Sequence, residues 1–305
     1  MILNGVTGTI LRPMLPEDVA PAAEMILGAG WGVRREWLAF AATQPACVPH
    51  VAESDGRVVA TGVGTANGPV GWIGTIFVEP KHRGRGLGRS MTQAIIERLE
   101  SARCGTLVLV ATSEGRRLYE RMGFDVQTQY RILESPGLAA ASEPGVAAPD
   151  AGAVAPGAGE SERRGATGAR PFAPADLAAM ASFDRVATGE DRAHVLARLA
   201  SPETAKVLTG DDGTLQAFVV RPPWGGGATV ARSIEAAMAI IAARRLVAGP
   251  EGQVRVGILA ENREGGAALA LAGFRAQWSA PRMVRGAPMV WQPEAIWGQF
   301  NHAMG

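Results

Sequence analysis

The chain has 305 residues, with 30 Lys and Arg against 29 Asp and Glu, and a formal net charge of +1. Hydrophobic residues make up 47% of it, enough for the buried cores of two domains of ordinary size. The balanced charge gives no reason to expect nucleic acid or a membrane as a partner. No basic region followed by a long apolar run opens the chain, and no transmembrane stretch appears, so we expect a cytoplasmic protein.

Cysteine and histidine do not form a metal-binding pattern. Cys47 and Cys104 lack the spacing of a disulfide or a metal site, and we expect both to be reduced and structural. The four histidines are scattered along the chain (His50, His82, His194 and His302). We therefore expect no metal.

The first informative junction lies between an apolar, strand-like run at 72–78 and an amphipathic helix expected at about 90–99. It reads Val78-Glu79-Pro80-Lys81-His82-Arg83-Gly84-Arg85-Gly86-Leu87-Gly88-Arg89-Ser90. Glycine lets the backbone approach a ligand closely, and the free N–H groups at a helix start attract anions. The basic residues beside them favour a phosphorylated cofactor, although a Gly- and Arg-rich turn is often only a solvated loop.

The spacing discriminates among the known phosphate loops. A dinucleotide fingerprint beginning at Gly84 would need glycine where Arg89 stands, and no Gly-Lys-Ser/Thr follows to make a Walker loop. The pattern that remains is Arg83-x-x-Gly86-x-Gly88, preceded by Val78-x-Pro80.

A second motif follows about thirty residues later. The continuously apolar run 107–112 predicts a buried strand. The helix expected after it has Ser113 as a candidate N-cap, and Gly123 closes it. Its last residues include Leu118-Tyr119 and Gly123-Phe124.

Together these two motifs resemble those of the GNAT N-acetyltransferases, which hold acetyl-CoA. Leu118-Tyr119 and Gly123-Phe124 match the family, while Thr112 stands in its usual Asn slot and Gly115 in its Ala slot. The resemblance implies an α/β (α+β) fold, with a mixed, mostly antiparallel central sheet flanked by helices.

The chain divides at a change of composition. Residues 137–169 are dominated by Ala, Gly, Pro, Glu and Ser and contain no aromatic residue, so they would gain little from burial. We expect a catalytic GNAT domain at 1–135, a flexible linker at 136–169 and a second, degenerate GNAT-like domain at 170–305.

An internal repeat supports the second domain. Arg12-Pro13 with Pro16 and Asp18 recurs as Arg170-Pro171 with Pro174 and Asp176, each reading as a strand that turns into a helix. A shift of 150 residues places Asn262 on Thr112, Gly265 on Gly115 and Gly273-Phe274 on Gly123-Phe124, after a strand expected at 254–259.

The two halves are not expected to be functionally equal. Leu269 corresponds to Tyr119, and the phosphate loop is expected to correspond to Pro222–Thr229, which has no basic residue among its glycines. We interpret the second half as a divergent copy kept for shape or substrate contact; a second CoA site is the alternative.

Further segments are similar to a subgroup of tandem GNAT proteins with a degenerate C-terminal domain. They include Trp72-Ile73-Gly74, Gly115-Arg116 and Arg282–Gly286. That subgroup usually has an aspartate where Val110 stands here, which bears on specificity or activity.

The resemblance implies acetyl-CoA as the cofactor and assigns roles to matching residues. The amide of Phe77 or Val78 would bind the thioester carbonyl, and Tyr119 would be the general acid, since its reference pKa near 10 keeps it protonated at neutral pH. The implied cofactor-binding residues are Phe77, Val78, Arg83, Gly84, Arg85, Gly86, Leu87, Gly88, Arg89, Ser90 and Thr112.

The general base and the acceptor stay open. The strand before the loop has Thr75 where some relatives carry a carboxylate, and Glu79 lies at its end, either as the base or facing solvent. Further base candidates, without motif support, are Glu36, His50, Glu53 and Asp184. The aromatic residues Trp31, Trp37, Phe40 and Trp72 either line an apolar acceptor pocket or belong to the core. Arg34 and Arg35 would favour an acidic or phosphorylated acceptor, unless they are simply solvated.

We therefore expect an acetyl-CoA-dependent N-acetyltransferase that acts on a small primary amine, as a monomer or homodimer. The alternatives are a non-catalytic acyl-CoA-binding or regulatory protein, and an acetyltransferase of protein lysines or N-termini.

Overall fold

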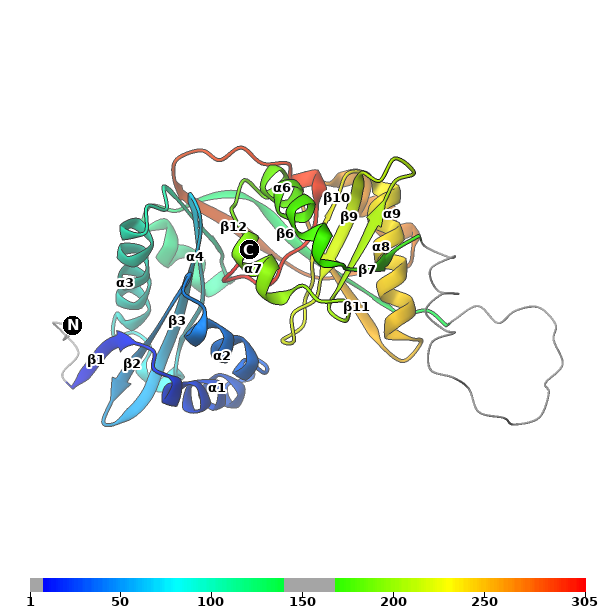
Figure 1. Ribbon diagram of the computed structural model, residues 1–305. Helices are drawn as coiled ribbons and strands as arrows, with labels where there is room; N and C mark the ends of the chain where they lie inside the picture. The colour runs from blue at the N-terminus through cyan, green and yellow to red at the C-terminus, as the bar shows by residue number, and fades with distance from the viewer. Residues whose placement is uncertain (1–7, 140–167) are drawn as a thin grey trace.

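The computed structural model describes residues 8–139 and 168–305. The linker expected at 136–169 falls mostly outside the described residues. The two halves lie side by side and share one large sheet (Figure 1). The first half supplies β1 (Thr9–Pro13), α1 (Val19–Gly28), α2 (Arg35–Thr43), β2 (Cys47–Ser54), β3 (Arg57–Asn67), β4 (Val70–Val78), α3 (Leu87–Ser101), β5 (Thr106–Val110), α4 (Ser113–Glu120) and β6 (Asp125–Pro136).

The second half repeats this order of elements. It comprises β7 (Arg170–Pro171), α6 (Leu177–Thr188), α7 (Ala193–Leu199), β8 (Ala205–Thr209), β9 (Leu215–Val220), β10 (Ala228–Ala231), α8 (Ile234–Ala248), β11 (Gln253–Leu259), α9 (Arg263–Leu271), β12 (Arg275–Gly286) and β13 (Ile296–Gly298). Short 3-10 helices are η1 (Pro16–Asp18), η2 (Pro80–His82), η3 (Pro174–Asp176) and η4 (Pro293–Ala295).

The same local device opens both halves and confirms the repeat. The Arg12 guanidinium donates to both carboxylate oxygens of Asp18 at 2.6 and 2.9 Å, and Arg170 does the same to Asp176 at 2.7 and 2.6 Å. Each carboxylate also accepts the backbone amide three residues before it, at 2.7 Å. This bidentate ion pair fixes the turn from strand into helix, and it holds the pKa of both carboxyl groups below the usual range.

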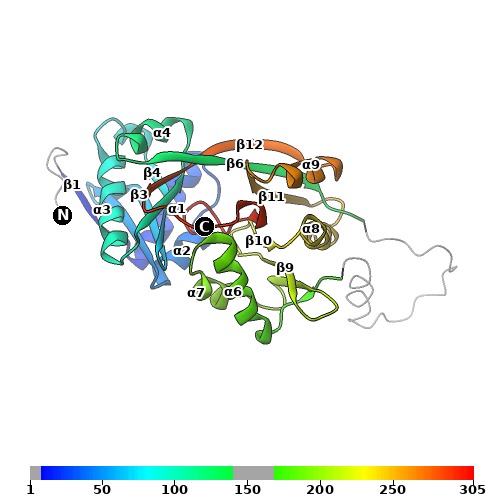
Figure 2. The same cartoon turned by 90° about the horizontal axis from the view of Figure 1, so that it is seen from above.

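The halves exchange their last long strands. The eight-stranded sheet has the order β1-β2-β3-β4-β5-β12-β6-β11, so β12 of the second half lies between β5 and β6 of the first. Reciprocally, β6 lies between β12 and β11. Seen from above, β6 and β12 run side by side across both halves (Figure 2).

The central pair has an approximate twofold symmetry. Arg275 pairs with Glu134 and Val284 pairs with Asp125. The shift of 150 residues that relates the repeats carries Asp125 to Arg275 and Glu134 to Val284, so it exchanges these two pairs. The exchange is thus built from equivalent strands of equivalent domains.

Helices cover the two faces of the first-half sheet differently. On one face α3 packs its apolar side (Met91, Ile95, Ile96 and Leu99) against Ile73, Leu107 and Leu109. On the other face, α1 and α2 form one core with α6, α7 and strands of the second half. The second half therefore covers the face of the first sheet that lies opposite α3.

Candidate functional site

The Gly- and Arg-rich segment lies, as expected, where β4 leads into α3. A short 3-10 turn (Pro80–His82) leaves the strand, and α3 begins at Leu87, three residues earlier than its pattern suggested. Gly84 and Gly86 adopt φ of +76° and +81°, and a Cβ on either would meet nothing within 4 Å. Both glycines are thus needed for the conformation of the loop, and the space beside them is open.

The start of α3 keeps its amide groups free. Gly86 is the N-cap and has no side chain to accept from the first turn, and no backbone N–H of residues 84–89 donates to another backbone group in the described part of the chain. Unsatisfied amides at the start of a fifteen-residue helix make a site for an anion. The residues present therefore fit the pyrophosphate of CoA.

β4 and β5 separate immediately beside this loop. The two parallel strands are paired only from Val70↔Thr106 to Trp72↔Val108, and beyond this point they part. A bulge in β4 follows, where Thr75 adopts φ of +52°. It is held from two sides, because Trp37 Nε1 donates to Thr75 Oγ1 and Thr61 Oγ1 donates to the Thr75 carbonyl, both at 3.0 Å. Phe77 and Val78 follow the bulge along the edge of this gap.

α4 follows β5, the strand on the far side of the gap, and carries Tyr119. Thr112, and not Ser113 as expected, is the N-cap, and its hydroxyl accepts from the Gly115 amide at 3.1 Å. The Tyr119 ring packs over Gly115 and against Phe124 in the same core cluster as Leu87. Its hydroxyl has no hydrogen-bond partner among the described groups, and burial raises the pKa of Tyr119 to about 12. The phenol is therefore protonated at neutral pH.

Arg83 joins the two sides of the gap. Its Nε donates to the Val78 carbonyl at 3.1 Å, and its Nη1 lies 3.7 Å from a Glu114 carboxylate oxygen at the start of α4. The structure thus brings together the end of β4, the loop and α4, which the sequence motifs place about thirty residues apart.

The candidate bases are engaged elsewhere. Glu79 lies 2.9 Å from His82 and 3.3 Å from Lys81, and Glu53 pairs with Arg12. His50 contacts the Val48 carbonyl, and Asp184 forms a buried ion pair with Arg192. Thr75 supports the bulge, and Glu36 lies exposed in the first turn of α2. Of these groups, Glu79 directly follows β4 at the gap, where Lys81 and His82 pair with it.

Most of the aromatic candidates are core residues. Trp37, Phe40 and Trp72 are buried, and Trp224 of the second half packs against Trp37 and Phe40. Trp31 differs, because it is exposed and packs edge-on against Phe77 at 5.2 Å. For the first three the core interpretation is therefore correct.

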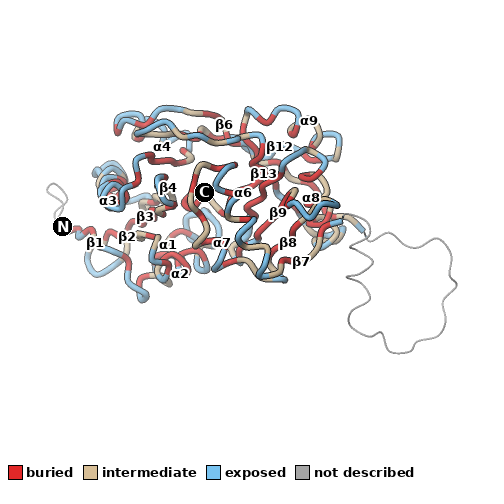
Figure 3. Tube along the Cα trace, turned by 45° about the horizontal axis from the view of Figure 1, so that its top comes forward, coloured by how far each residue is buried: buried red, intermediate tan, exposed pale blue. Residues whose placement is uncertain are grey.

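The second half also contributes residues 299–305, here called the tail, which cross onto β3 and β4. Thr65 Oγ1 donates to the Ala303 carbonyl at 2.7 Å, and Asn67 Nδ2 donates to the Met304 carbonyl at 2.8 Å. Gly74 lies directly under the His302 carbonyl, so any larger residue there would clash. The tail, buried or half-buried between the halves in Figure 3, lies on the face opposite α3, beside the β4 bulge. No sequence motif pointed to it.

His302 places a titratable group on this face. Its Nδ1 is enclosed without a hydrogen-bond partner, and its ring packs against Tyr130 and Trp278 at 5.0 and 5.3 Å. Burial and the nearby Arg34 charge lower the pKa of His302 to about 4.

This depressed pKa predicts an acid-sensitive fold. Below about pH 6.5 this histidine is protonated in the unfolded chain but stays neutral in the folded protein. The free energy of unfolding should therefore fall as the pH drops from 6.5 toward 4, by up to about 3 kcal/mol. Urea titrations at pH 7 and pH 5 check this. His302→Gln should show a smaller drop between the two pH values than the wild type, and an equal drop would contradict the assignment.

In the second half the equivalent gap, between β10 and β11, is closed. The strand-to-helix junction of this half is Arg232-Ser233, between β10 and α8, whereas Pro222–Thr229 connects β9 to β10 and enters β10. The expected correspondence of Pro222–Thr229 with the phosphate loop is therefore wrong. Ser233 caps α8 by accepting the Ala236 amide at 3.2 Å, so this helix start is already partly satisfied.

A strand also fills the space between β10 and β11. β13 pairs with β10 and contacts β11, and Trp297 packs its ring onto Gly265 of α9. A hollow of about 820 Å³ remains beside the starts of α8 and α9, and its lining has four acidic residues (Glu235, Glu261, Glu264 and Glu294) against two basic ones (Arg232 and Arg263). The excess of carboxylates disfavours a pyrophosphate, and the helix start is capped by Ser233, so the hollow differs from the site of the first half.

Other features bound the chemistry. Cys47 and Cys104 are buried and unpaired. Within residues 8–139 and 168–305, no cluster of three or more His, Cys, Asp or Glu side chains is arranged to hold a metal ion. No helix in that part of the chain combines the length and apolar character needed to cross a bilayer.

Comparison with known families identifies both halves. Residues 16–124 match the acetyltransferase (GNAT) family, and residues 180–298 match an acetyltransferase (GNAT) domain. A curated relative, the L-methionine sulfoximine/L-methionine sulfone acetyltransferase of Salmonella typhimurium, is 38% identical over 60 residues, which are 18% of this chain and 34% of the relative. The chain thus spans about a third of the length of that relative.

Solved structures share the whole arrangement. A candidate acetyltransferase from Pyrococcus horikoshii superposes with a TM-score of 0.76 at 18% identity, covering 98% of this chain and 97% of the other. A GCN5-related N-acetyltransferase from Sphaerobacter thermophilus gives 0.61 at 17% identity over 94% and 99% of the two chains. A tandem GNAT protein from the clavulanic acid biosynthesis pathway gives 0.56 at 15% identity over 92% and 99%. At these identities the likeness concerns the fold.

Proposed function

Since the chain belongs to the GNAT acetyltransferase family, with two GNAT domains in tandem, we propose that it is an acetyl-CoA-dependent N-acetyltransferase of a small primary amine. The cofactor binds to the first half. The observation that carries this assignment is the contrast between the two helix starts, because α3 presents free amides behind an open glycine loop whereas α8 is capped and its gap is filled.

Each part of the first-half site has a role in this proposal. The bound cofactor supplies an acetyl group activated as a thioester. The amides of residues 84–89 and the side chains of Arg83, Arg85 and Arg89 hold its phosphates. The amide of Phe77 or Val78, beside the fixed bulge, polarises the carbonyl to be attacked. Tyr119 keeps a proton on its hydroxyl and gives it to the departing sulfur.

The proposed acceptor is small because the second half stands over the face from which it must arrive. The tail lies on Gly74 beside the bulge, and this leaves less room for a protein chain than for a small molecule. The curated relative's printed substrates, methionine sulfoximine and methionine sulfone, are also small amines and support this class.

Cofactor binding is tested by two matched glycine substitutions. Gly86→Val forces a branched side chain into φ of +81° in the loop, and we expect it to weaken acetyl-CoA binding at least 10-fold. Gly225→Val introduces the same strain at φ of +87° in the second half, where a Cβ also meets nothing within 4 Å. It should leave the affinity unchanged. Calorimetric titration with acetyl-CoA measures both.

Release of free CoA thiol over a panel of amino acids, polyamines, amino sugars and aryl amines then tests turnover. Saturable binding with thiol release on small amines supports the proposal. Binding without release on any amine would favour a regulatory acyl-CoA-binding protein, and release on peptides alone would favour a protein acetyltransferase. Absence of acetyl-CoA binding would overturn the proposal.

A further inference from the structure

One buried cation on the face opposite α3 is not satisfied by the protein. Arg282 lies in the middle of β12 with only 1% of its surface exposed. Its Nη2 contacts the Met289 sulfur at 3.6 Å, while Nε and Nη1 have no hydrogen-bond partner among residues 8–139 and 168–305. Sulfur is a weak acceptor, and a buried charge without a bonded partner costs several kcal/mol, so the site is costly to maintain as it stands.

The surroundings stabilise the charge without occupying its donors. The guanidinium is flanked by the Trp72 and Trp291 rings at 5.4 and 4.3 Å. Burial lowers the pKa of Arg282 only to about 10, so the group is charged at neutral pH, helped by Glu190 and Glu261. Both carboxylates bond elsewhere, because Glu190 accepts from Asn67 at 2.8 Å and Glu261 accepts from Thr128 at 2.6 Å.

The residue opposite Arg282 could have supplied a carboxylate but does not. Val110 of β5 is its direct cross-strand partner. Both side chains lie on the Trp72 face of the sheet, where Val110 packs on the cluster of Trp72 and Val108. Directly opposed residues have Cβ atoms about 4.5–5.5 Å apart, so a carboxylate at position 110 would reach the guanidinium.

This pair stands at the gap in which acetyl transfer is proposed. β4 and β5 are last paired at Trp72↔Val108, and Val110 lies two residues beyond. One strand spacing of about 4.8 Å separates β5 from β12. A group bound to Arg282 is therefore within the length of a small molecule of the gap.

We propose that the acceptor amine carries a carboxylate, and that Nε and Nη1 of Arg282 bind it while the amine reaches the gap between β4 and β5. This rests on the proposed function and names its substrate class. A planar guanidinium binds a carboxylate through two parallel hydrogen bonds, which supply the missing partners. Binding requires Met289 and Trp291 to move off the guanidinium; both are half-buried and belong to the segment 287–292, in which Val290 is 92% exposed.

The first test compares L-amino acids with their primary amides as acceptors, by thiol release at saturating acetyl-CoA. We expect kcat/KM to favour the acids by about 10- to 100-fold, the range of a charge-assisted hydrogen-bond pair. Val110→Asp supplies an internal carboxylate and should abolish this preference, whereas the uncharged Val110→Asn should retain most of it. Arg282→Met keeps the bulk between the tryptophans and should also abolish the preference. Equal rates for acids and amides in the wild type, or a preference that survives Arg282→Met, would overturn the inference.

The second test separates this inference from the proposed function. N-acetyl amino acids carry the carboxylate but cannot be acetylated again, so their binding by calorimetric titration needs no turnover. Binding that is lost in Val110→Asp, in a protein that acetylates no amine, would sustain the carboxylate site and reject the proposed function. Turnover of amines, with no binding of N-acetyl amino acids and no preference for acids, would sustain the proposed function and reject the carboxylate site. Acetyl-CoA affinity should be unchanged in all three variants.

Discussion

Replacing Tyr119 by Phe should lower kcat by about 10²-fold and leave the acetyl-CoA dissociation constant within twofold of the wild type. General acid catalysis contributes factors of this size, and the substitution removes only the hydroxyl. The ring keeps its packing over Gly115 and against Phe124, so the fold should not change. Steady-state kinetics with the best amine of the panel, together with calorimetric titration, measure both quantities.

The pH profile gives a second check on the same residue. Because burial raises the pKa of Tyr119 to about 12, the acid form persists throughout the usual assay range. Ionisation of Tyr119 should therefore cause no decline of the wild-type kcat between pH 8 and pH 10. Any decline in this range should also be present in Tyr119→Phe. A kcat for Tyr119→Phe within threefold of the wild type would exclude Tyr119 as the acid.

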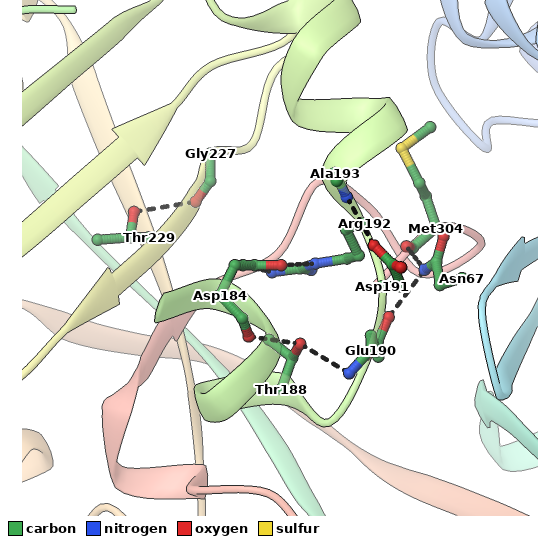
Figure 4. Close-up of polar contacts among 10 residues, drawn as sticks. All are labelled: Asn67, Asp184, Thr188, Glu190, Asp191, Arg192, Ala193, Gly227, Thr229 and Met304. Carbon is green, nitrogen blue, oxygen red and sulfur yellow. Dashed lines mark hydrogen bonds and ion pairs between the residues drawn. The ribbon is translucent and has the colours of Figure 1, made fainter. Parts of the chain in front are cut away.

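Asp184→Asn should lower the free energy of unfolding by about 3–5 kcal/mol, because it leaves a fully buried guanidinium without the carboxylate that is hydrogen-bonded to it. Asp184 accepts from Arg192 at 2.5 and 2.9 Å, and both side chains are 1% exposed. The pair lies next to the hydrogen bond between Asn67 and Glu190, which joins β3 to the loop after α6 (Figure 4). Urea unfolding at pH 7 measures the loss.

A matched control lies in the same loop. Asp191 pairs with Arg185 at 2.8 Å, but these side chains are 44% and 59% exposed, so Asp191→Asn should cost less than about 1 kcal/mol. The double variant Asp184→Leu/Arg192→Met removes both charges of the pair but also the Arg192 charge that faces buried Glu190, so it should recover only part of the stability lost in Asp184→Asn. Equal losses for Asp184→Asn and Asp191→Asn would contradict the assigned role of the buried pair.

The elements and the two-domain plan follow from local signals in the sequence. These signals act within a few residues, so they can be recognised without the structure. They are the glycines at 84 and 86, the helix cap at Thr112 or its neighbour, and the Arg-Asp ion pair at the start of both domains. The roles assigned to Tyr119 and to residues 83–90 in acetyl transfer stay predictions.

The strand exchange and the closed second gap could not be predicted in this way. β6 and β12 occupy equivalent positions in the repeat, so local patterning does not say which half each will join. β13 has only three residues, too few for any periodicity, yet it decides that the second gap is filled. The sequence places Arg282 only within a family-like segment, because the absence of a partner for its donors among the described residues is visible only in three dimensions.

The exchange of β6 and β12 also restricts how the protein can move. Two-domain proteins often open and close about a hinge, since their domains meet through modest interfaces. Here such an opening would have to break the backbone ladders β5·β12 and β6·β11, which tie each half to a strand of the other. The halves should therefore move as one rigid body, and the proposed acceptor would have to enter by movement of short segments such as 287–292.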